Sequence, residues 1–139
     1  YVSTDTLKLS SLLKEKFPLR ILLAEDHPIN QKLMQIMLQR FGFVVDLAQD
    51  GNEAVNLLQQ HMYDLVFMDI QMPVMDGLEA TRRIRKGLGP NRQPVIIAMT
   101  ANALQEDRKK CMNAGMDDFM VKPIKLDMVE NMIVKWGES

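Results

Sequence analysis

Four apolar runs of this sequence each end at a side chain that can take part in chemistry. The runs are residues 20–24, 65–69, 95–99 and 118–121, and the residues at their ends are Glu25 with Asp26, Asp69, Thr100 and Lys122. Carboxylates bind hard cations, whereas an ammonium group and a hydroxyl suit phosphate oxygens. These residue types together indicate a site for a phosphoryl group.

The three acids restrict that chemistry. Held close together, Glu25, Asp26 and Asp69 would raise one another's pKa unless a positive charge lay among them. Mg²⁺, or Mn²⁺ in its place, prefers oxygen ligands, so we expect Asp26 and Asp69 to bind it directly and Glu25 through water. Lys122 would then pair with one phosphate oxygen and Thr100 with another. Because a carboxylate can act as a nucleophile, Asp69 is predicted to accept the phosphoryl group.

The elements that must position these residues alternate between strand and helix. Strands are predicted at residues 20–24, 44–48, 65–69, 95–99 and 118–121, and helices after Pro28 and Gly51 and at 78–86, 104–114 and 126–136. Continuous apolar runs of this length are typical of parallel strands buried on both faces. Five strand-then-helix units predict an α/β fold with a parallel sheet, right-handed crossovers and helices on both faces. The ends of its strands would converge on one edge, which is the candidate site.

The helix after the first acid pair begins at Pro28 and is predicted to stop at Gly42. Its apolar positions, predicted to face the core, are Ile29, Leu33, Ile36, Met37 and Phe41.

Composition excludes several classes of function. With 17 Lys and Arg against 18 Asp and Glu, the net charge of −1 shows no excess of basic residues of the kind that nucleic-acid binding favours. The single cysteine, Cys111, excludes an internal disulfide and favours a reducing compartment. No apolar run approaches the roughly 20 residues of a membrane helix. We therefore expect a cytoplasmic domain that contacts neither nucleic acid nor membrane directly.

A length of 139 residues suits one domain. Residues 1–18 are predicted to form a linker or N-terminal extension, with Leu9, Leu12, Leu13 and Phe17 along one side of a helix, and residues 19–139 the domain itself. The chain starts at Tyr1 without a methionine or a signal-peptide pattern, which indicates a segment of a longer protein.

Five separated motifs carry a family resemblance. They are Ala24-Glu25-Asp26, Met68-Asp69, Met72-Pro73-Val74-Met75-Asp76-Gly77, Thr100-Ala101 and Lys122-Pro123. Their order and positions over residues 19–136 resemble the receiver domain of two-component response regulators. The resemblance implies a flavodoxin-like, doubly wound five-stranded sheet in the order 2-1-3-4-5 and phosphoryl transfer from a histidine.

The resemblance also implies roles for individual residues. Asp69 would be the phosphoacceptor, assisted by Lys122 and Thr100, and the metal ligands would be Glu25, Asp26, Asp69 and the Gln71 carbonyl. Thr100 and Phe119 would act as switch residues, and the peptide bond before Pro123 would be cis. The motifs around residues 24–31 and 76–81 resemble receivers of hybrid sensor histidine kinases, whose partner is a histidine kinase core or a histidine phosphotransfer domain. His27 stands where many members carry asparagine.

Other interpretations remain open at this stage. Thr100 could simply cap the next helix, and Phe119 could be a core residue. A phosphohydrolase with an aspartyl nucleophile would share the metal and the lysine, although Gln71 stands where such enzymes commonly carry a second aspartate. A nucleotide-binding module would need a glycine-rich loop after the first strand, and here that loop is acidic. The domain is thus expected to lack turnover activity of its own.

Overall fold

The computed structural model describes residues 13–138. Its sheet has five parallel strands in the order β2-β1-β3-β4-β5. The strands are β1 Ile21–Ala24, β2 Asp46–Ala48, β3 Leu65–Asp69, β4 Val95–Thr100 and β5 Asp118–Val121. The predicted flavodoxin-like order is confirmed. The second strand begins two residues later than predicted, because Val44 is 84% exposed and pairing with β1 starts at Asp46.

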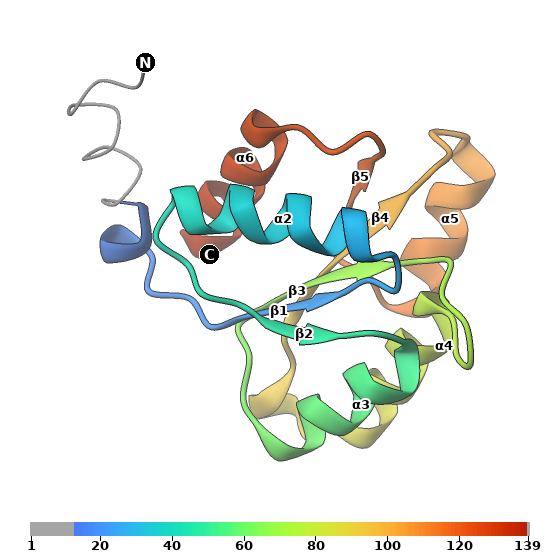
Figure 1. Cartoon of the computed structure of the whole chain (residues 1–139). Coiled ribbons are helices and arrows are strands. Elements are labelled where there is room, and N and C mark those ends of the chain that lie inside the picture. The colour runs from blue at the N-terminus through green and yellow to red at the C-terminus, as the bar shows by residue number, and fades with distance from the viewer. Residues whose placement is uncertain (1–12, 139) are drawn as a thin grey trace.

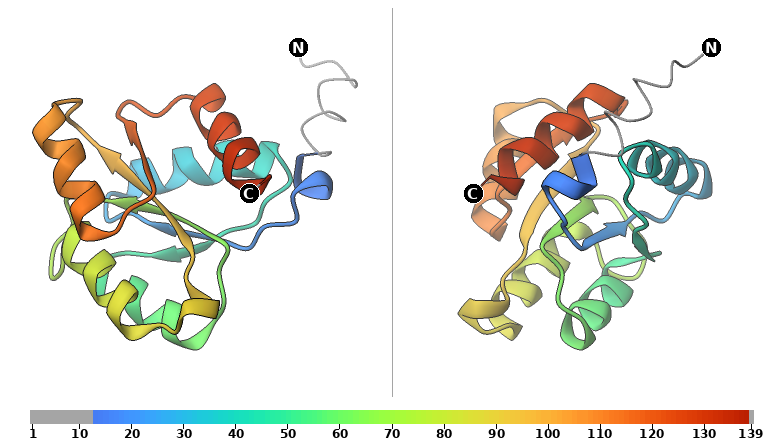
Figure 2. Two further views of the ribbon diagram at one scale, coloured as in Figure 1. Left: turned by 180° about the vertical axis from the view of Figure 1, so that it is seen from behind. Right: turned by 90° about the vertical axis from the view of Figure 1, so that its left-hand side faces the viewer.

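Helices cover both faces of this sheet (Figure 1). They are α2 Pro28–Arg40, α3 Gly51–Gln60, α4 Gly77–Gly87, α5 Gln105–Ala114 and α6 Leu126–Gly137, with a short 3-10 helix, η1, at Pro90–Arg92. Figure 2 shows α2 and α6 on one side of the sheet and α3 and α4 on the other. The five predicted helices are confirmed. Within residues 13–138, every helix is too short or too polar to cross a membrane.

The central strand β3 packs into a core on each of its faces, which explains why residues 65–68 are all apolar. Leu65 and Phe67 pack into the core beneath α2 and α6, whereas Val66 and Met68 pack into the core beneath α3, α4 and α5. Successive side chains of a strand point to opposite faces, so a strand between two helical layers needs apolar residues at every position. Asp69 interrupts this pattern at the end of the strand and is nevertheless buried.

Residues 13–20, the described part of the segment before β1, pack onto the domain. Residues 13–16 are helical, and Phe17 is buried against the backbone of Gly137 at the end of α6. Leu13 also contacts this core. Leu9 and Leu12, the other two residues of the predicted apolar side, lie outside the described residues.

The prediction for the buried face of α2 was wrong in part. Met34 and Leu38 are its buried residues, followed by Phe41 just beyond its end. Ile29, Leu33 and Ile36, which were predicted to face the core, are 66%, 53% and 47% exposed, and Met37 is half-buried. Both sets follow the same helical spacing, about 140° apart around the helix axis. Spacing alone therefore could not show which set faces the sheet.

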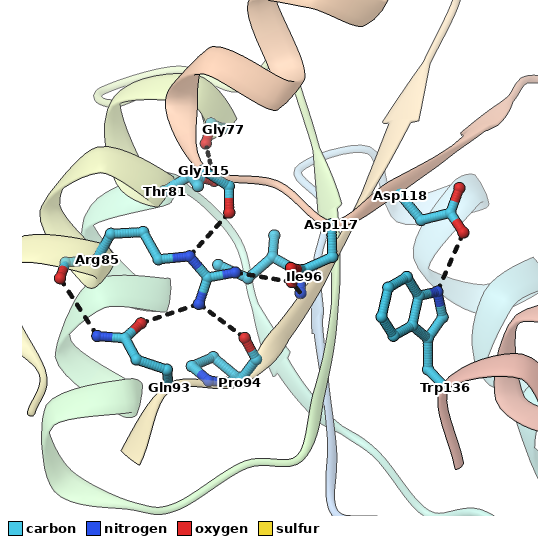
Figure 3. Close-up of polar contacts among 10 residues, drawn as sticks. All are labelled: Gly77, Thr81, Arg85, Gln93, Pro94, Ile96, Gly115, Asp117, Asp118 and Trp136. Carbon is cyan, nitrogen blue, oxygen red and sulfur yellow. Dashed lines mark hydrogen bonds and ion pairs between the residues drawn. The ribbon is translucent and has the colours of Figure 1, made fainter. Parts of the chain in front are cut away.

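Arg85 links three parts of the chain near the start of β4 (Figure 3). Its guanidinium group donates to the carbonyls of Gly115 at 2.8 Å and Pro94 at 2.7 Å, and to Gln93 Oε1 at 2.9 Å. It also pairs with Asp117 Oδ2 at 2.8 Å, which accepts the main-chain N–H of Ile96. One partly buried side chain thus joins α4 to the start of β4 and to the turn between α5 and β5.

Replacing Arg85 with methionine is expected to lower the free energy of unfolding by about 2–3 kcal/mol, because several carbonyls and a carboxylate lose a charged donor. Arg82→Met is the matched control. Arg82 is half-exposed and pairs only with Glu79 among the ion pairs of the described residues, so its loss should cost less than about 1 kcal/mol. Urea denaturation measures both values, and equal losses would contradict a linking role for Arg85.

Trp136, the only tryptophan of the chain, is tied to the last strand. Its indole N–H donates to Asp118 Oδ2 at 3.1 Å, and Lys135 Nζ lies 2.7 Å from the same oxygen (Figure 3 shows the Trp136 bond). Burial alone would raise the pKa of Asp118, but hydrogen bonds from Lys135, the Phe119 N–H and Trp136 outweigh it and lower that pKa. Helix α6 is therefore attached to β5 one residue before Phe119.

Candidate functional site

Three carboxylates meet at the carboxyl-terminal edge of the sheet. Glu25 and Asp26 follow β1, Asp69 ends the adjacent strand β3, and one oxygen from each lies within 4.8 Å of the others. Glu25 is 1% and Asp69 3% exposed, whereas Asp26 is exposed. The structure thus brings together the three acids that the sequence placed at two separate strand ends.

Lys122 reaches this cluster from the end of β5. Its Nζ lies 3.1 Å from Asp69 Oδ1 and 3.5 Å from Glu25 Oε1. The main-chain N–H of Lys122 donates to the Thr100 carbonyl at 2.7 Å, and the peptide bond to Pro123 is cis, as the resemblance implied. The ammonium group is therefore held between the two buried carboxylates.

Electrostatics at the cluster favour a further cation. Burial is the main cause that raises the pKa of Glu25, and the neighbouring carboxyl of Asp69 raises that pKa further. The His27 N–H, which donates to Glu25 Oε2 at 3.2 Å, and the charge of Lys122 offset this only in part. Among the salt bridges of the described residues, Lys122 is the only cation paired with these acids. The three carboxylates supply oxygen donors of the kind that Mg²⁺ prefers.

The loop from β3 to α4 closes over Asp69. The Gln71 N–H donates to Asp69 Oδ1 at 3.3 Å. Gly77, the first residue of α4, donates its N–H to the Ile70 carbonyl at 2.9 Å. A Cβ atom at Gly77 would lie 2.2 Å from the Asp69 carbonyl oxygen, so glycine is required by space here. Gln71 is thereby placed beside the acid cluster.

Comparison with known proteins assigns this arrangement to a family. Residues 21–134 match the model of the response regulator receiver domain. The chain belongs to this family.

This receiver domain is similar in sequence to histidine kinases and to receiver domains of known structure. It is 40% identical over 138 residues to "Histidine protein kinase 1" of Candida albicans, covering 93% of this chain and 6% of that protein. The chain thus spans only a small part of that curated relative. The receiver domain of the sensor histidine kinase PA1611 from Pseudomonas aeruginosa, solved with a magnesium ion in its active-site cleft, is 43% identical with a TM-score of 0.80. That match covers 87% of this chain and 98% of the other.

A third relative was solved with a partner. The receiver domain of Ssk1 from Saccharomyces cerevisiae, in complex with the histidine phosphotransfer protein Ypd1, is 35% identical with a TM-score of 0.78. The match covers 85% of this chain and 88% of that one.

The two expected switch residues of this receiver domain lie on neighbouring strands. The Thr100 hydroxyl exchanges hydrogen bonds with the backbone of Asn102, donating at 3.2 Å and accepting at 3.1 Å. Phe119 on β5 pairs with Ala98 of β4 and is half-buried, and the Arg108 guanidinium carbon lies 4.3 Å from its ring centroid. Thr100 also lines a pocket of about 90 Å³ together with Asp69 and Lys122.

Three contacts at this site were not predicted. His27 caps α2 through its Nδ1, which accepts the Ile29 N–H at 3.3 Å. The Gln31 amide donates to the Glu25 carbonyl at 2.7 Å, and the Asn102 backbone holds Thr100. A polar residue just before Pro28 is a capping signal that could have revealed His27. Gln31 and Asn102 have no comparable signal because their contacts depend on how the loops close.

Proposed function

We propose that this receiver domain is a phosphoacceptor in a two-component phosphorelay and takes a phosphoryl group from a phosphohistidine onto Asp69. The observation that carries the proposal is the surroundings of Asp69. Asp69 is 3% exposed and ends the central strand, and its carboxylate lies 3.1 Å from an ammonium group and within 4.8 Å of two further carboxylates. Such a nucleophile has positive charge ready for the group that it receives.

The metal ligands proposed are the carboxylates of Glu25, Asp26 and Asp69 and the backbone carbonyl of Gln71. Mg²⁺ bound there would supply positive charge against the transferring phosphoryl oxygens. The excess of carboxylates over ammonium groups supports this assignment. The magnesium ion in the PA1611 receiver, a protein of the same family, supports it as well.

The chain's own residues divide the remaining work. A carboxylate oxygen of Asp69 attacks phosphorus, the bond between phosphorus and the histidine nitrogen breaks, and its electron pair stays on the imidazole. Lys122 exchanges its carboxylate contacts for a phosphoryl oxygen, to which its compact charge is suited. The Thr100 hydroxyl, bonded to the Asn102 backbone beforehand, can turn to another oxygen.

Intact mass spectrometry after incubation with Mg²⁺ and acetyl phosphate tests the proposal. We expect a gain of one phosphoryl group per chain, which is lost again by hydrolysis. A protein that gains none, with Mg²⁺ bound, would overturn the assignment. Sustained release of phosphate from excess phosphoester would instead favour the phosphohydrolase alternative, in which the domain is a turnover enzyme.

The partner proposed is a histidine kinase core or a histidine phosphotransfer domain, and a hybrid histidine kinase is the proposed parent protein. The exposed face of α2, formed by Ile29, Leu33 and Ile36, supports such a partner. Leu33 also lines a cavity of about 110 Å³ together with Glu25 and Lys122, so this apolar face is continuous with the acid cluster. A phosphotransfer domain could pack on it and bring its histidine to Asp69.

Leu33→Glu is expected to slow phosphoryl transfer from a phosphorylated histidine phosphotransfer protein by at least about tenfold, because a charge would enter an apolar interface. Phosphorylation by acetyl phosphate should stay at the wild-type rate. Met62→Glu is the control, since Met62 is 58% exposed but lies two residues beyond the end of α3. If both variants accept phosphate from the protein donor equally well, the partner does not dock on α2.

A further inference from the structure

One residue of the loop beside Asp69 has a costly backbone conformation. Val74 has a φ of 68°, in the left-handed region that β-branched residues rarely enter. It lies in the connection between β3 and α4, where the Met75 N–H also donates to the Pro73 carbonyl at 2.7 Å. A strained conformation persists only where neighbouring contacts hold it in place. Contacts with neighbouring residues must therefore hold this loop in its conformation.

One contact that holds this loop comes from helix α3. Gly51, the first residue of α3, is buried and donates its N–H to the Met75 carbonyl at 3.0 Å. A Cβ atom at Gly51 would lie 2.3 Å from that carbonyl oxygen and 2.9 Å from its carbon. Space, rather than backbone conformation, requires glycine here, because in residues 13–138 only Gly42 and Gly115 are glycines with positive φ.

Helix α3 itself is a firm support for this contact. Asp50 caps it by accepting the Glu53 N–H at 2.8 Å, and Ala54 and Leu58 anchor it in the core. Its first turn therefore cannot move easily to make room for a side chain at Gly51. A clash there would displace the loop at Met75 instead.

A displacement of this loop would also shift the Asp69 carboxylate. Near the start of the loop, the Gln71 N–H donates to Asp69 Oδ1, and just after the loop Gly77 packs on the Asp69 backbone. Asp76 fixes that end by accepting the Glu79 N–H at 2.8 Å. The contact between Gly51 and Met75 lies between these two attachments.

We propose that Gly51 is a positioning residue for the site: by holding Met75 it fixes the loop that orients Asp69 and carries Gln71. This inference rests on the proposed phosphoacceptor function. Gly51 touches neither metal nor phosphate. It acts through the backbone of the loop, and nothing about its position near the start of α3 reveals that role in the sequence.

Gly51→Ala is expected to weaken Mg²⁺ binding and to slow phosphorylation by acetyl phosphate, each by about tenfold, because displacements of about 1 Å have large effects on such reactions. Mg²⁺ affinity, followed by the amide chemical shift of Gln71, is a readout that a merely structural role would leave unchanged. Gly87→Ala is the control, since a Cβ atom there meets nothing within 4 Å. It should match the wild type in both measurements.

A second measurement needs no variant. Hydrogen exchange of the Gly51 amide in the wild-type protein should slow when Mg²⁺ saturates the site, because the contact and the metal would stabilise each other. Unchanged exchange, or a folded Gly51→Ala protein with wild-type Mg²⁺ affinity, would overturn the inference while leaving the proposed function intact. A wild-type chain that cannot be phosphorylated would overturn the proposed function itself.

Discussion

Asp69→Asn should abolish the gain of a phosphoryl group from acetyl phosphate. An amide oxygen is a far weaker nucleophile than a carboxylate, and the substitution also removes one of the three charges that attract the metal. Asparagine is close to aspartate in size, so Lys122 can still lie beside Glu25 and the fold should be retained. Intact mass spectrometry and circular dichroism measure the two effects separately.

Asp127→Asn is the matched control for this change. Asp127 is exposed in the first turn of α6, and its side chain accepts a hydrogen bond from the Met128 N–H. The control should be phosphorylated at the wild-type rate. If Asp69→Asn still gains a phosphoryl group at that rate, the acceptor is another side chain, and peptide mapping of the product would identify it.

The second large effect is expected from Asp26→Ala, which should weaken Mg²⁺ binding by at least about tenfold from the millimolar range. Asp26 is exposed, whereas Glu25 and Asp69 are buried beside Lys122, so its removal should disturb the metal more than the fold. Chemical shifts of the Gln71 amide during an Mg²⁺ titration measure the affinity.

The control for the metal prediction is Asp127→Ala, which removes an exposed acid that is not one of the three clustered carboxylates. It should leave the Mg²⁺ titration unchanged. An unchanged titration in Asp26→Ala would place the metal elsewhere. A strongly lowered free energy of unfolding in that variant would instead make Asp26 a structural residue.

The sheet and its acid cluster were predictable because two independent features of the sequence agree. Strands such as β3 are apolar at every position, and the polar residue that ends each one must lie at the carboxyl-terminal edge. Asp69 and Lys122 therefore meet in space, although Lys122 follows Asp69 by 53 positions in the sequence. The chemistry of the residues then restricts what such a cluster can bind.

The sequence could not show which face of α2 would be exposed, because Met34 and Leu38 repeat at the same helical spacing as Ile29 and Leu33. Only the packing of α2 against the sheet and α6 separates the two sets. The left-handed conformation of Val74 and the approach of Gly51 to Met75 were equally hidden. Both depend on loops and helices meeting in three dimensions, for which local spacing gives no signal.

The bond between Trp136 and Asp118 gives this protein a built-in optical reporter. Indole emission shifts with the polarity and hydrogen bonding around the ring, and a single tryptophan makes any shift assignable to one position. Asp118 precedes Phe119 directly, so repacking of that ring would strain or break the bond to the indole. Rearrangement of β5 can therefore be timed by stopped-flow fluorescence in the unlabelled chain.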